Sequence, residues 1–379
     1  MRASLFYISI LLTLSSLCLG SFQISFLKEI NKDNKNKNFV FSPMSIYQIL
    51  SLTANGARGN TLHEMVKALS GNSITELNRI NSEILNAAKN FTSIEIANAI
   101  MTRIEPLDEF KKIAYSYDAT IEKLKSADQV NSWCFLKTHG KILQIVDQLD
   151  PLTKMILLNA IYFKGTWKNK FKPEKTQKKY FYNFGDQTKP VQVNMMNLET
   201  KFNYYSDEKV QVIEIPFSKD SVSAVIFLPK KLQNINDFIA ELDDQKIKKY
   251  LNSLFPITVD LELPKFKIEF ESGLNTYLHN LGMKQAFSPM ADLSGLAKGG
   301  NDLYIDSVIQ KAFIEVDESG AEAAAVTAVI IKGWSSIINI SQRMYVNRPF
   351  LMMLRSKALP EDNDVLFMAK IEELNLDKK

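Results

Sequence analysis

Residues 313–325 of this chain read Phe313-Ile314-Glu315-Val316-Asp317-Glu318-Ser319-Gly320-Ala321-Glu322-Ala323-Ala324-Ala325, and Val326-Thr327-Ala328-Val329-Ile330-Ile331 follow. The alanines favour a helix, whereas the runs on both sides of them favour a strand. Read with a period of two, one face of this segment is small or apolar throughout, and Gly320 before it can act as a hinge. Such a conflict is typical of a chain that changes its conformation; the alternative is an amphipathic helix packed on the core.

The rest of the chain shows helical patterns first and strand patterns later. Apolar residues recur at helical spacing in 46–52 and 62–69. Met155–Phe163 is a nearly continuous apolar run, as in a strand that is covered on both faces. Further strand patterns lie at 210–215, 223–228, 257–263 and 365–371. The Asn- and Lys-rich stretch 31–38 reads as a solvated loop and not as a linker, so we expect one α+β domain.

The composition is that of an ordinary globular protein, with 46% hydrophobic and 23% charged residues and a formal net charge of +4. These values argue against a disordered or polytopic membrane chain, and so small a charge does not predict a nucleic-acid partner. The three histidines and two cysteines form no zinc-site or CxxC pattern, and GxGxxG, Walker and GxSxG motifs are absent. We therefore expect no metal, no cofactor and no enzymatic activity. Composition alone still permits a hydrolase built from Ser, His and a carboxylate, although no motif supports one.

The first twenty residues have the pattern of a secretory signal peptide. Arg2 is their only charge, an apolar run at 5–14 follows, and Cys18-Leu19-Gly20 precedes a cut ahead of Ser21. The run is short for a membrane span of about 20 residues, and a buried first helix is the alternative. We expect a secreted protein with a mature chain of 21–379, in which Asn90 and Asn339 are N-glycosylation sequons.

Five motifs follow one another along the chain, at 38–46, 56–61, 158–167, 313–325 and 347–351. They are similar to the serpin segments that open helices B and C, form strand 3A, form the hinge of the reactive-centre loop, and close that loop. On these residues the chain is identified as a member of the serpin family from about Phe22 to its C-terminus. The resemblance implies a single α+β domain with helices packed on a large mixed sheet, two smaller sheets, and an exposed reactive-centre loop at about 318–346.

The resemblance also implies a suicide-substrate inhibitor of a serine protease. In that mechanism the protease cuts the loop, and the cut loop inserts as a new strand into sheet A while the acyl-enzyme is trapped. Small side chains that face inward would enter the sheet without a clash, whereas a charge or a proline there would block insertion. Neither is present, so we expect an inhibitor; a non-inhibitory serpin acting as a carrier or chaperone is the alternative. The hinge residues are Glu318, Gly320, Ala321, Glu322, Ala323, Ala324 and Ala325.

The spacing of the family from hinge Glu318 places the scissile bond between Trp334 and Ser335. A large aromatic side chain suits the hydrophobic slot of a chymotrypsin-like protease. A register shifted by two residues would instead place the bond between Lys332 and Gly333 and would suit a trypsin-like protease. A protease that accepts both aromatic and basic residues could use either bond.

The resemblance further implies two polar clusters around sheet A. The shutter positions, whose hydrogen bonds clamp the sheet before insertion, are Ser42, Ser45, Asn159 and Gln310. Gln310 replaces the usual histidine, so we expect no step in inhibition with a pKa near about 6.5. The breach positions at the top of the sheet are Trp167, Lys265 and Glu318, and an ordinary exposed ion pair is the alternative reading of the last two.

A run of lysines could bind a sulfated polysaccharide, although a solvated face is the more usual meaning of such a run. Cys134 is expected to be a small buried residue and not a reactive thiol. From the resemblance, the expected partner is a serine protease. We expect no binding of nucleic acid or membrane, and we expect the protein to be a monomer. The lysines are Lys168, Lys170, Lys172, Lys175, Lys178 and Lys179.

Overall fold

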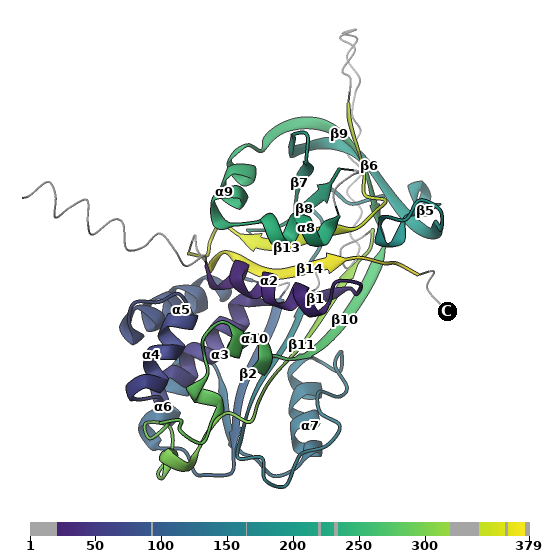
Figure 1. The fold of residues 1–379 in the computed structure, drawn as a ribbon. Coiled ribbons are helices and arrows are strands. Elements are labelled where there is room, and N and C mark those ends of the chain that lie inside the picture. The colour runs from purple at the N-terminus through teal and green to yellow at the C-terminus, as the bar shows by residue number, and fades with distance from the viewer. Residues whose placement is uncertain are drawn as a thin grey trace, which may run out of the picture.

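The computed structural model describes residues 21–91, 94–163, 165–218, 221–230, 234–318, 341–360 and 363–375 (Figure 1). The predicted signal peptide at 1–20, the hinge beyond Glu318 and both candidate scissile bonds lie outside these residues. No helix in the described ranges is long and apolar enough to cross a membrane.

Helices dominate the first part of the described chain, as predicted. The helical patterns at 46–52 and 62–69 lie in α3 and α4, which confirms both predictions. Ser42 caps the N-terminus of α3: its hydroxyl accepts a hydrogen bond from the Ser45 N–H at 3.2 Å, and Pro43 occupies the first turn of the helix. The α-helices are α2 (Phe22–Asp33), α3 (Pro43–Gly56), α4 (Gly59–Ala68), α5 (Ile74–Ala88), α6 (Asp108–Ser116), α7 (Ala127–Lys137), α8 (Ile235–Glu241), α9 (Asp244–Asn252) and α10 (Asn275–Asn280).

The strands form two sheets. The five-stranded sheet has the order β10 (Phe266–Gly273), β11 (Ser307–Val316), β4 (Met155–Phe163), β2 (Ile94–Thr102) and β3 (Thr120–Lys123). The nine-stranded sheet has the order β1 (Phe39–Phe41), β14 (Val365–Ile371), β13 (Phe350–Ser356), β8 (Val222–Pro229), β7 (Val210–Pro216), β6 (Val191–Ser206), β9 (Phe255–Pro264) and β12 (Gln342–Tyr345), and β5 (Gln177–Phe181) pairs with β6.

Strand β4 is covered on both faces, and this explains its unbroken apolar run. Ile156, Leu158 and Ala160 pack in a small core with Val130 and Cys134 of α7. The alternate residues of β4 pack in the main core, which also contains the buried residues of α3. The five-stranded sheet is therefore a layer between α7 and α3.

The centre of the five-stranded sheet is a parallel pair. Strand β11 pairs directly with β4 from Ser307 opposite Ile156 to Ile314 opposite Phe163. No described strand lies between them. A segment that leaves the end of β11 and turns back would run antiparallel to both strands.

Three details differ from the sequence-based expectations. The two smaller sheets are continuous, because β6 is 16 residues long and pairs with β5, β7 and β9 in turn. The first part of the chain also contains β2 and β3, which helical periodicity did not predict. The stretch 31–38 is only partly a solvated loop, since α2 extends to Asp33 and the side chain of Asn34 is buried.

Candidate functional site

A row of three amide side chains crosses the middle of the five-stranded sheet. Asn98 of β2 and Gln310 of β11 are the direct partners of Asn159 of β4 in the strand register. All three are buried, with exposed fractions of 6%, 2% and 0% in the order Asn98, Gln310 and Asn159. Because direct partners in adjacent strands point to the same face, the row faces the start of α3.

The hydrogen bonds of this row form one network with a fixed direction. The backbone N–H of Ser42 donates to Gln310 Oε1 at 3.0 Å, so Gln310 Nε2 must be a donor, and it donates to Asn159 Oδ1 at 2.6 Å. The Ser45 hydroxyl also donates to Asn159 Oδ1, at 2.8 Å. Asn159 Nδ2 is thus left to donate to Asn98 Oδ1 at 2.7 Å. One backbone N–H sets the orientation of all three amides.

The structure therefore brings together all four predicted shutter residues, Ser42, Ser45, Asn159 and Gln310. Sequence reasoning missed Asn98, although it interrupts the apolar residues of Ala97–Ala99. Alternation alone gives no partner for such a residue, and only the strand register places it beside Asn159. That this network clamps the sheet stays a prediction.

None of the side chains in this network titrates near neutral pH, so we expect no step in thermal stability near pH 6.5 that arises from it. The variant Gln310→His should acquire such a step. A buried imidazolium is poorly solvated, which depresses its pKa in the folded state, so stability should be lost as the pH falls through about 6.5. Unfolding midpoints of both proteins between pH 5.5 and 8 test this. A step of equal size in the wild type would contradict it.

A second cluster lies just beyond the end of β11. Lys265 Nζ lies 2.6 Å from Glu318 Oε2, and the Thr176 hydroxyl donates to Glu318 Oε1 at 2.8 Å. The Trp167 indole N–H donates to the carbonyl of Asp317 at 2.9 Å. The indole is buried and stacks on Phe217, with 4.3 Å between ring centroids. The three predicted breach residues thus lie together, and they hold the chain where it leaves β11.

The Lys265–Glu318 pair is not the exposed ion pair of the alternative reading, because the exposed fractions of the two side chains are only 31% and 13%. Burial by itself would raise the pKa of Glu318. The hydrogen bonds from Lys265 and Thr176 outweigh that effect and hold the pKa below its usual range. The ionised carboxylate therefore stabilises the folded protein.

We expect Glu318→Gln to lower the free energy of unfolding by about 1–2 kcal/mol at pH 7, the range for a partly buried charged hydrogen bond. Because the pKa of Glu318 is lowered by folding, the stabilisation is full above its unfolded value and is lost as the pH falls through the folded value. The difference between wild type and variant should therefore shrink below about pH 4. Denaturant titrations at pH 7 and pH 3.5 measure it; an unchanged difference would count against the assignment.

The structure describes some of the remaining predicted residues, namely one of the two sequon asparagines and the cysteine. Asn90 is exposed just after α5, whereas Asn339 lies outside the described residues, and glycosylation of both stays a prediction. Cys134 is fully buried, as expected, and burial raises the pKa of its thiol to about 12. Among the described residues, no group of three or more His, Cys, Asp or Glu could hold a metal ion.

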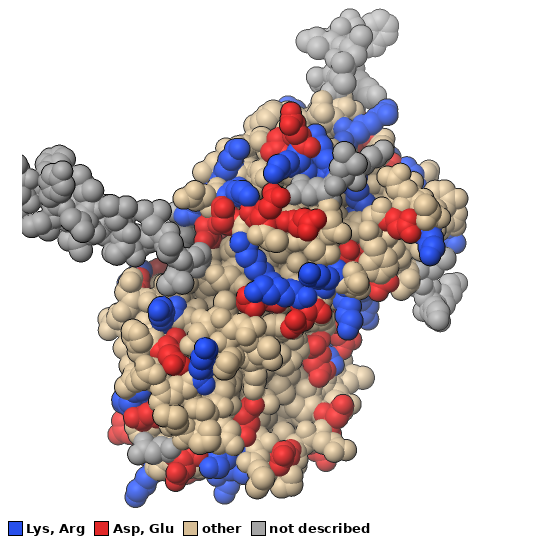
Figure 2. All heavy atoms as spheres, viewed as in Figure 1, with Lys and Arg blue, Asp and Glu red and all other residues tan. Residues whose placement is uncertain are grey.

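The lysine run leads into β5, and its last two members, Lys178 and Lys179, belong to that strand. Lys168, Lys172, Lys175 and Lys178 are exposed, and Lys179 forms an ion pair with Glu262 of β9. On the face that Figure 2 shows, basic and acidic side chains are interspersed over most of the surface.

The fold and these two clusters define a class of protein. It is a single α+β domain in which the parallel strands β4 and β11 pair directly, and the residues that follow β11 are held by Trp167 and Lys265. A family model described as serpin (serine protease inhibitor) matches residues 19–374. The chain belongs to the serpin family.

Curated relatives agree. The chain is 32% identical to intracellular coagulation inhibitor 2 of Tachypleus tridentatus, over 90% of this chain and 87% of the relative. It is 34% identical to a leukocyte elastase inhibitor of Xenopus tropicalis, over 91% and 96%. These relatives are named as inhibitors and not as enzymes.

Solved structures agree as well. Serpin48 of the insect Tenebrio molitor superimposes with a TM-score of 0.82 at 32% identity, covering 93% of this chain and 96% of that one. Human thyroxine-binding globulin with thyroxine gives 0.84 at 27% identity, covering 94% and 97%. Native protease nexin-1 with heparin gives 0.82 at 25% identity, covering 93% and 97%. The predicted serpin fold is confirmed.

Proposed function

We propose that this chain is a suicide-substrate inhibitor of a serine protease, which traps the acyl-enzyme by inserting its cleaved loop between β4 and β11. The proposal rests on the pairing of β4 with β11, which is direct along eight residue pairs. In the sequence, the small residues of the predicted hinge follow β11 just after Glu318. A strand inserted there would run antiparallel to two strands that now run parallel to each other.

The energy for trapping would come from the added strand. Inserting about 15 residues forms backbone hydrogen bonds that contribute roughly 0.5–1.5 kcal/mol each, so the release is on the order of 10 kcal/mol. That is comparable to the whole folding stability of an ordinary domain, about 5–15 kcal/mol. Before cleavage, the Asn98–Asn159–Gln310 row and the Lys265–Glu318 pair would restrain the opening of the sheet.

We propose Trp334–Ser335 as the scissile bond and a chymotrypsin-like protease as the target. The aromatic side chain fits the hydrophobic slot of such enzymes, and Gly333 leaves the preceding backbone free to extend. Lys332–Gly333 with a trypsin-like target is the second candidate.

The test is to mix the mature chain with chymotrypsin and, separately, with trypsin, followed by denaturing gels and the mass of the released C-terminal peptide. A gel-stable complex with a peptide that begins at Ser335 is expected. Trp334→Ala should abolish the complex with chymotrypsin, whereas the matched variant Lys332→Ala should leave it unchanged. A peptide that begins at Gly333 would move the bond to Lys332. Cleavage without a covalent complex for every protease tried would refute inhibition.

That last outcome would favour a non-inhibitory carrier. The similarity to thyroxine-binding globulin, solved with thyroxine, is the observation in its favour. Against it stand the hinge alanines, which are free of charge and proline at each inward position.

We further propose that the protein is secreted after removal of residues 1–20; a mature N-terminus at Ser21 in the medium of expressing cells tests this. For the lysine run we propose a solvated face. Protease nexin-1 was solved with heparin, which makes a sulfated polysaccharide the competing reading. Elution of the mature chain from immobilised heparin at physiological salt would support the solvated face, and retention would support the polysaccharide.

A further inference from the structure

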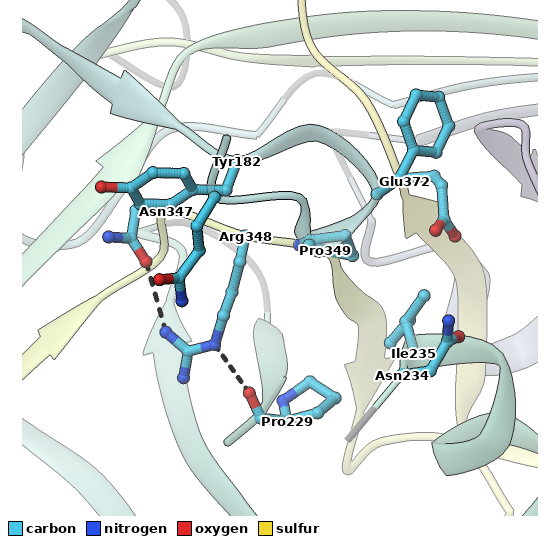
Figure 3. A pocket seen from close by; sticks show the side chains of 11 residues that line it. Tyr182, Pro229, Asn234, Ile235, Asn347, Arg348, Pro349 and Glu372 are labelled. Atoms are coloured by element: carbon cyan, nitrogen blue, oxygen red, sulfur yellow. Dashed lines mark hydrogen bonds between the residues drawn. The ribbon is translucent and has the colours of Figure 1, made fainter. Parts of the chain in front are cut away.

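A small pocket lies where the chain passes from β12 into β13. Its walls are the turn at Asn183–Gly185, the start of α8, and the residues that lead into β13 (Figure 3). Polar groups make up most of its accessible lining, and Pro229, Ile235 and Pro349 form an apolar wall on part of it. Its volume of about 140 Å³ is close to that of a cavity known to hold one benzene molecule, about 150 Å³.

Arg348 lines this pocket and carries a charge without a counter-ion. Its Nε–H donates to the carbonyl of Pro229 at 2.8 Å, and one Nη donates to Asn347 Oδ1 at 3.2 Å. A guanidinium has five N–H groups, so the others have no protein acceptor in the described part of the chain. Within those residues, Arg348 forms no salt bridge to a carboxylate. Burial lowers its pKa, yet an arginine remains charged at neutral pH.

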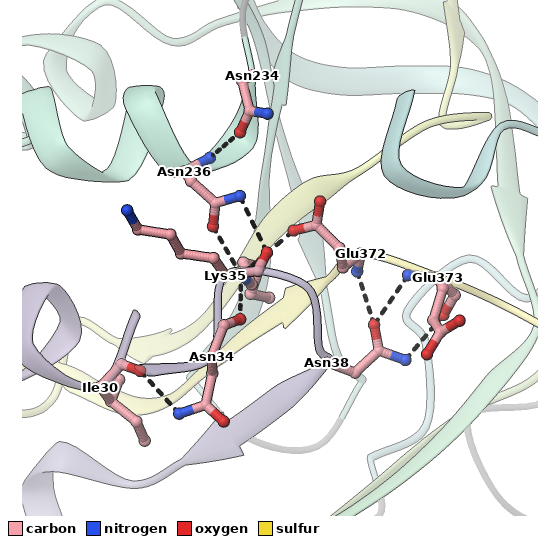
Figure 4. A network of polar contacts seen from close by, with 9 residues as sticks. Ile30, Asn34, Lys35, Asn38, Asn234, Asn236, Glu372 and Glu373 are labelled. Atoms are coloured by element: carbon pink, nitrogen blue, oxygen red, sulfur yellow. Dashed lines mark hydrogen bonds and ion pairs between the residues drawn. The ribbon is translucent and has the colours of Figure 1, made fainter. Parts of the chain in front are cut away.

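A half-buried basic side chain of β13 and a buried one of β14 are paired, in contrast to Arg348. Arg355 lies against Asp364, and the fully buried Lys370 lies 3.2 Å from Glu372. Lys370 also donates to the carbonyls of Asn34 and Lys35 and to Asn236 Oδ1, at 2.6–3.0 Å. Figure 4 shows these three partners gathered beside Glu372. Glu372, the one carboxylate that lines the pocket, is therefore neutralised by Lys370. Among the described residues that line the pocket, Arg348 is therefore the one charge without an ion-pair partner.

The pocket is also accessible. It shares Asn347 and Arg348 with a larger hollow of about 910 Å³ beside β12. The lining of that hollow carries charges of both signs, from Glu208, Asp237, Glu241, Lys209, Lys230 and Arg343. Arg348 thus borders both the open hollow and the small pocket with its partly apolar wall. A ligand can enter from the hollow and place its apolar part against Ile235 and Pro349.

We propose that this pocket binds a small aromatic carboxylate, whose carboxylate pairs with the guanidinium of Arg348 and whose ring packs on Pro229, Ile235 and Pro349. A carboxylate matches the planar donor fork of arginine, and pairing in a partly desolvated site is stronger than on an open surface. The volume admits one ring and excludes a polysaccharide. This inference does not depend on the proposed inhibitory function.

The experiment uses benzoate as the probe and benzamide as its neutral isostere, titrated into the mature chain in low-chloride buffer and followed by calorimetry and nitrogen-15 NMR. We expect benzoate to bind at least about tenfold more tightly than benzamide. Arg348→Gln should remove that preference, whereas the matched variant Arg343→Gln, in the exposed hollow, should keep the affinity within about twofold.

The Arg348 Nε–H signal gives a readout that needs no variant, so the test survives if Arg348→Gln fails to fold. Benzoate should shift this signal, because the carboxylate contacts the same guanidinium, and benzamide should not. Equal binding of the two probes, no benzoate binding up to about 10 mM, or an equal loss in Arg343→Gln would overturn the proposal.

Discussion

Replacing Ala323 by Arg should abolish inhibition while the loop is still cleaved. On the proposed mechanism, Ala323 enters the sheet between β4 and β11 with its side chain pointing inward. A guanidinium there would be buried without a partner, which costs several kcal/mol. Even about 3 kcal/mol added to the barrier slows insertion roughly 100-fold, so the acyl-enzyme would hydrolyse before it is trapped.

The matched control is Glu322→Arg, because neighbouring residues of a strand point to opposite faces and this side chain would stay on the outer one. Titration of the target protease with each variant gives the number of inhibitor molecules consumed per trapped enzyme. That number should rise at least about tenfold for Ala323→Arg and change little for Glu322→Arg. Equal inhibition by Ala323→Arg and the wild type would rule out insertion in this register.

Replacing Asn159 by Ala should cause the largest loss of stability of any single change in the polar row. Asn159 is fully buried and bonds three side chains, those of Ser45, Asn98 and Gln310. The substitution leaves these groups without that partner, and each stranded buried group costs about 1–3 kcal/mol. We expect a loss of roughly 3–5 kcal/mol and, for a chain of this length, a fall in the unfolding midpoint of about 4–7 °C.

The control is Asn197→Ala on β6, where a half-buried amide makes a side-chain bond to Asp260 at 2.7 Å. Its loss should be within about 1.5 kcal/mol. Thermal and denaturant unfolding of both variants measure the comparison. If the two substitutions cost the same, the row would not be the clamp that we infer.

Much of the fold could be predicted from local pattern. The apolar periodicity of α3 and α4 and the unbroken run of β4 were sufficient to predict their types, because each has an apolar face or core that a single period describes. Strand β6 was not predicted, since polar residues occupy much of its exposed face and its 16 residues serve three different partners. Strand β2 was missed because the elements before and after it in the sequence, α5 and α6, are helices.

Some residues of the candidate site could likewise be predicted from the sequence, and others could not. Ser42, Asn159 and Glu318 could be named from motifs, because the resemblance attaches a role to each position. Asn98 and Arg348 could not. Asn98 is recognised only from its register with Asn159, and Arg348 only from having no carboxylate partner among the described residues in a pocket built by three distant segments.

By itself, the sequence determined the class of this protein: an α+β serpin with a predicted hinge of small residues, and no motif for metal or cofactor chemistry. Only the tertiary structure decided that β4 and β11 are in direct contact and that one backbone N–H at Ser42 orients three amides. It also decided that Arg348 has no counter-ion among the described residues. The reason is physical. Periodicity and propensity act between residues a few positions apart, whereas strand register, burial and charge pairing join residues that are up to hundreds of positions apart.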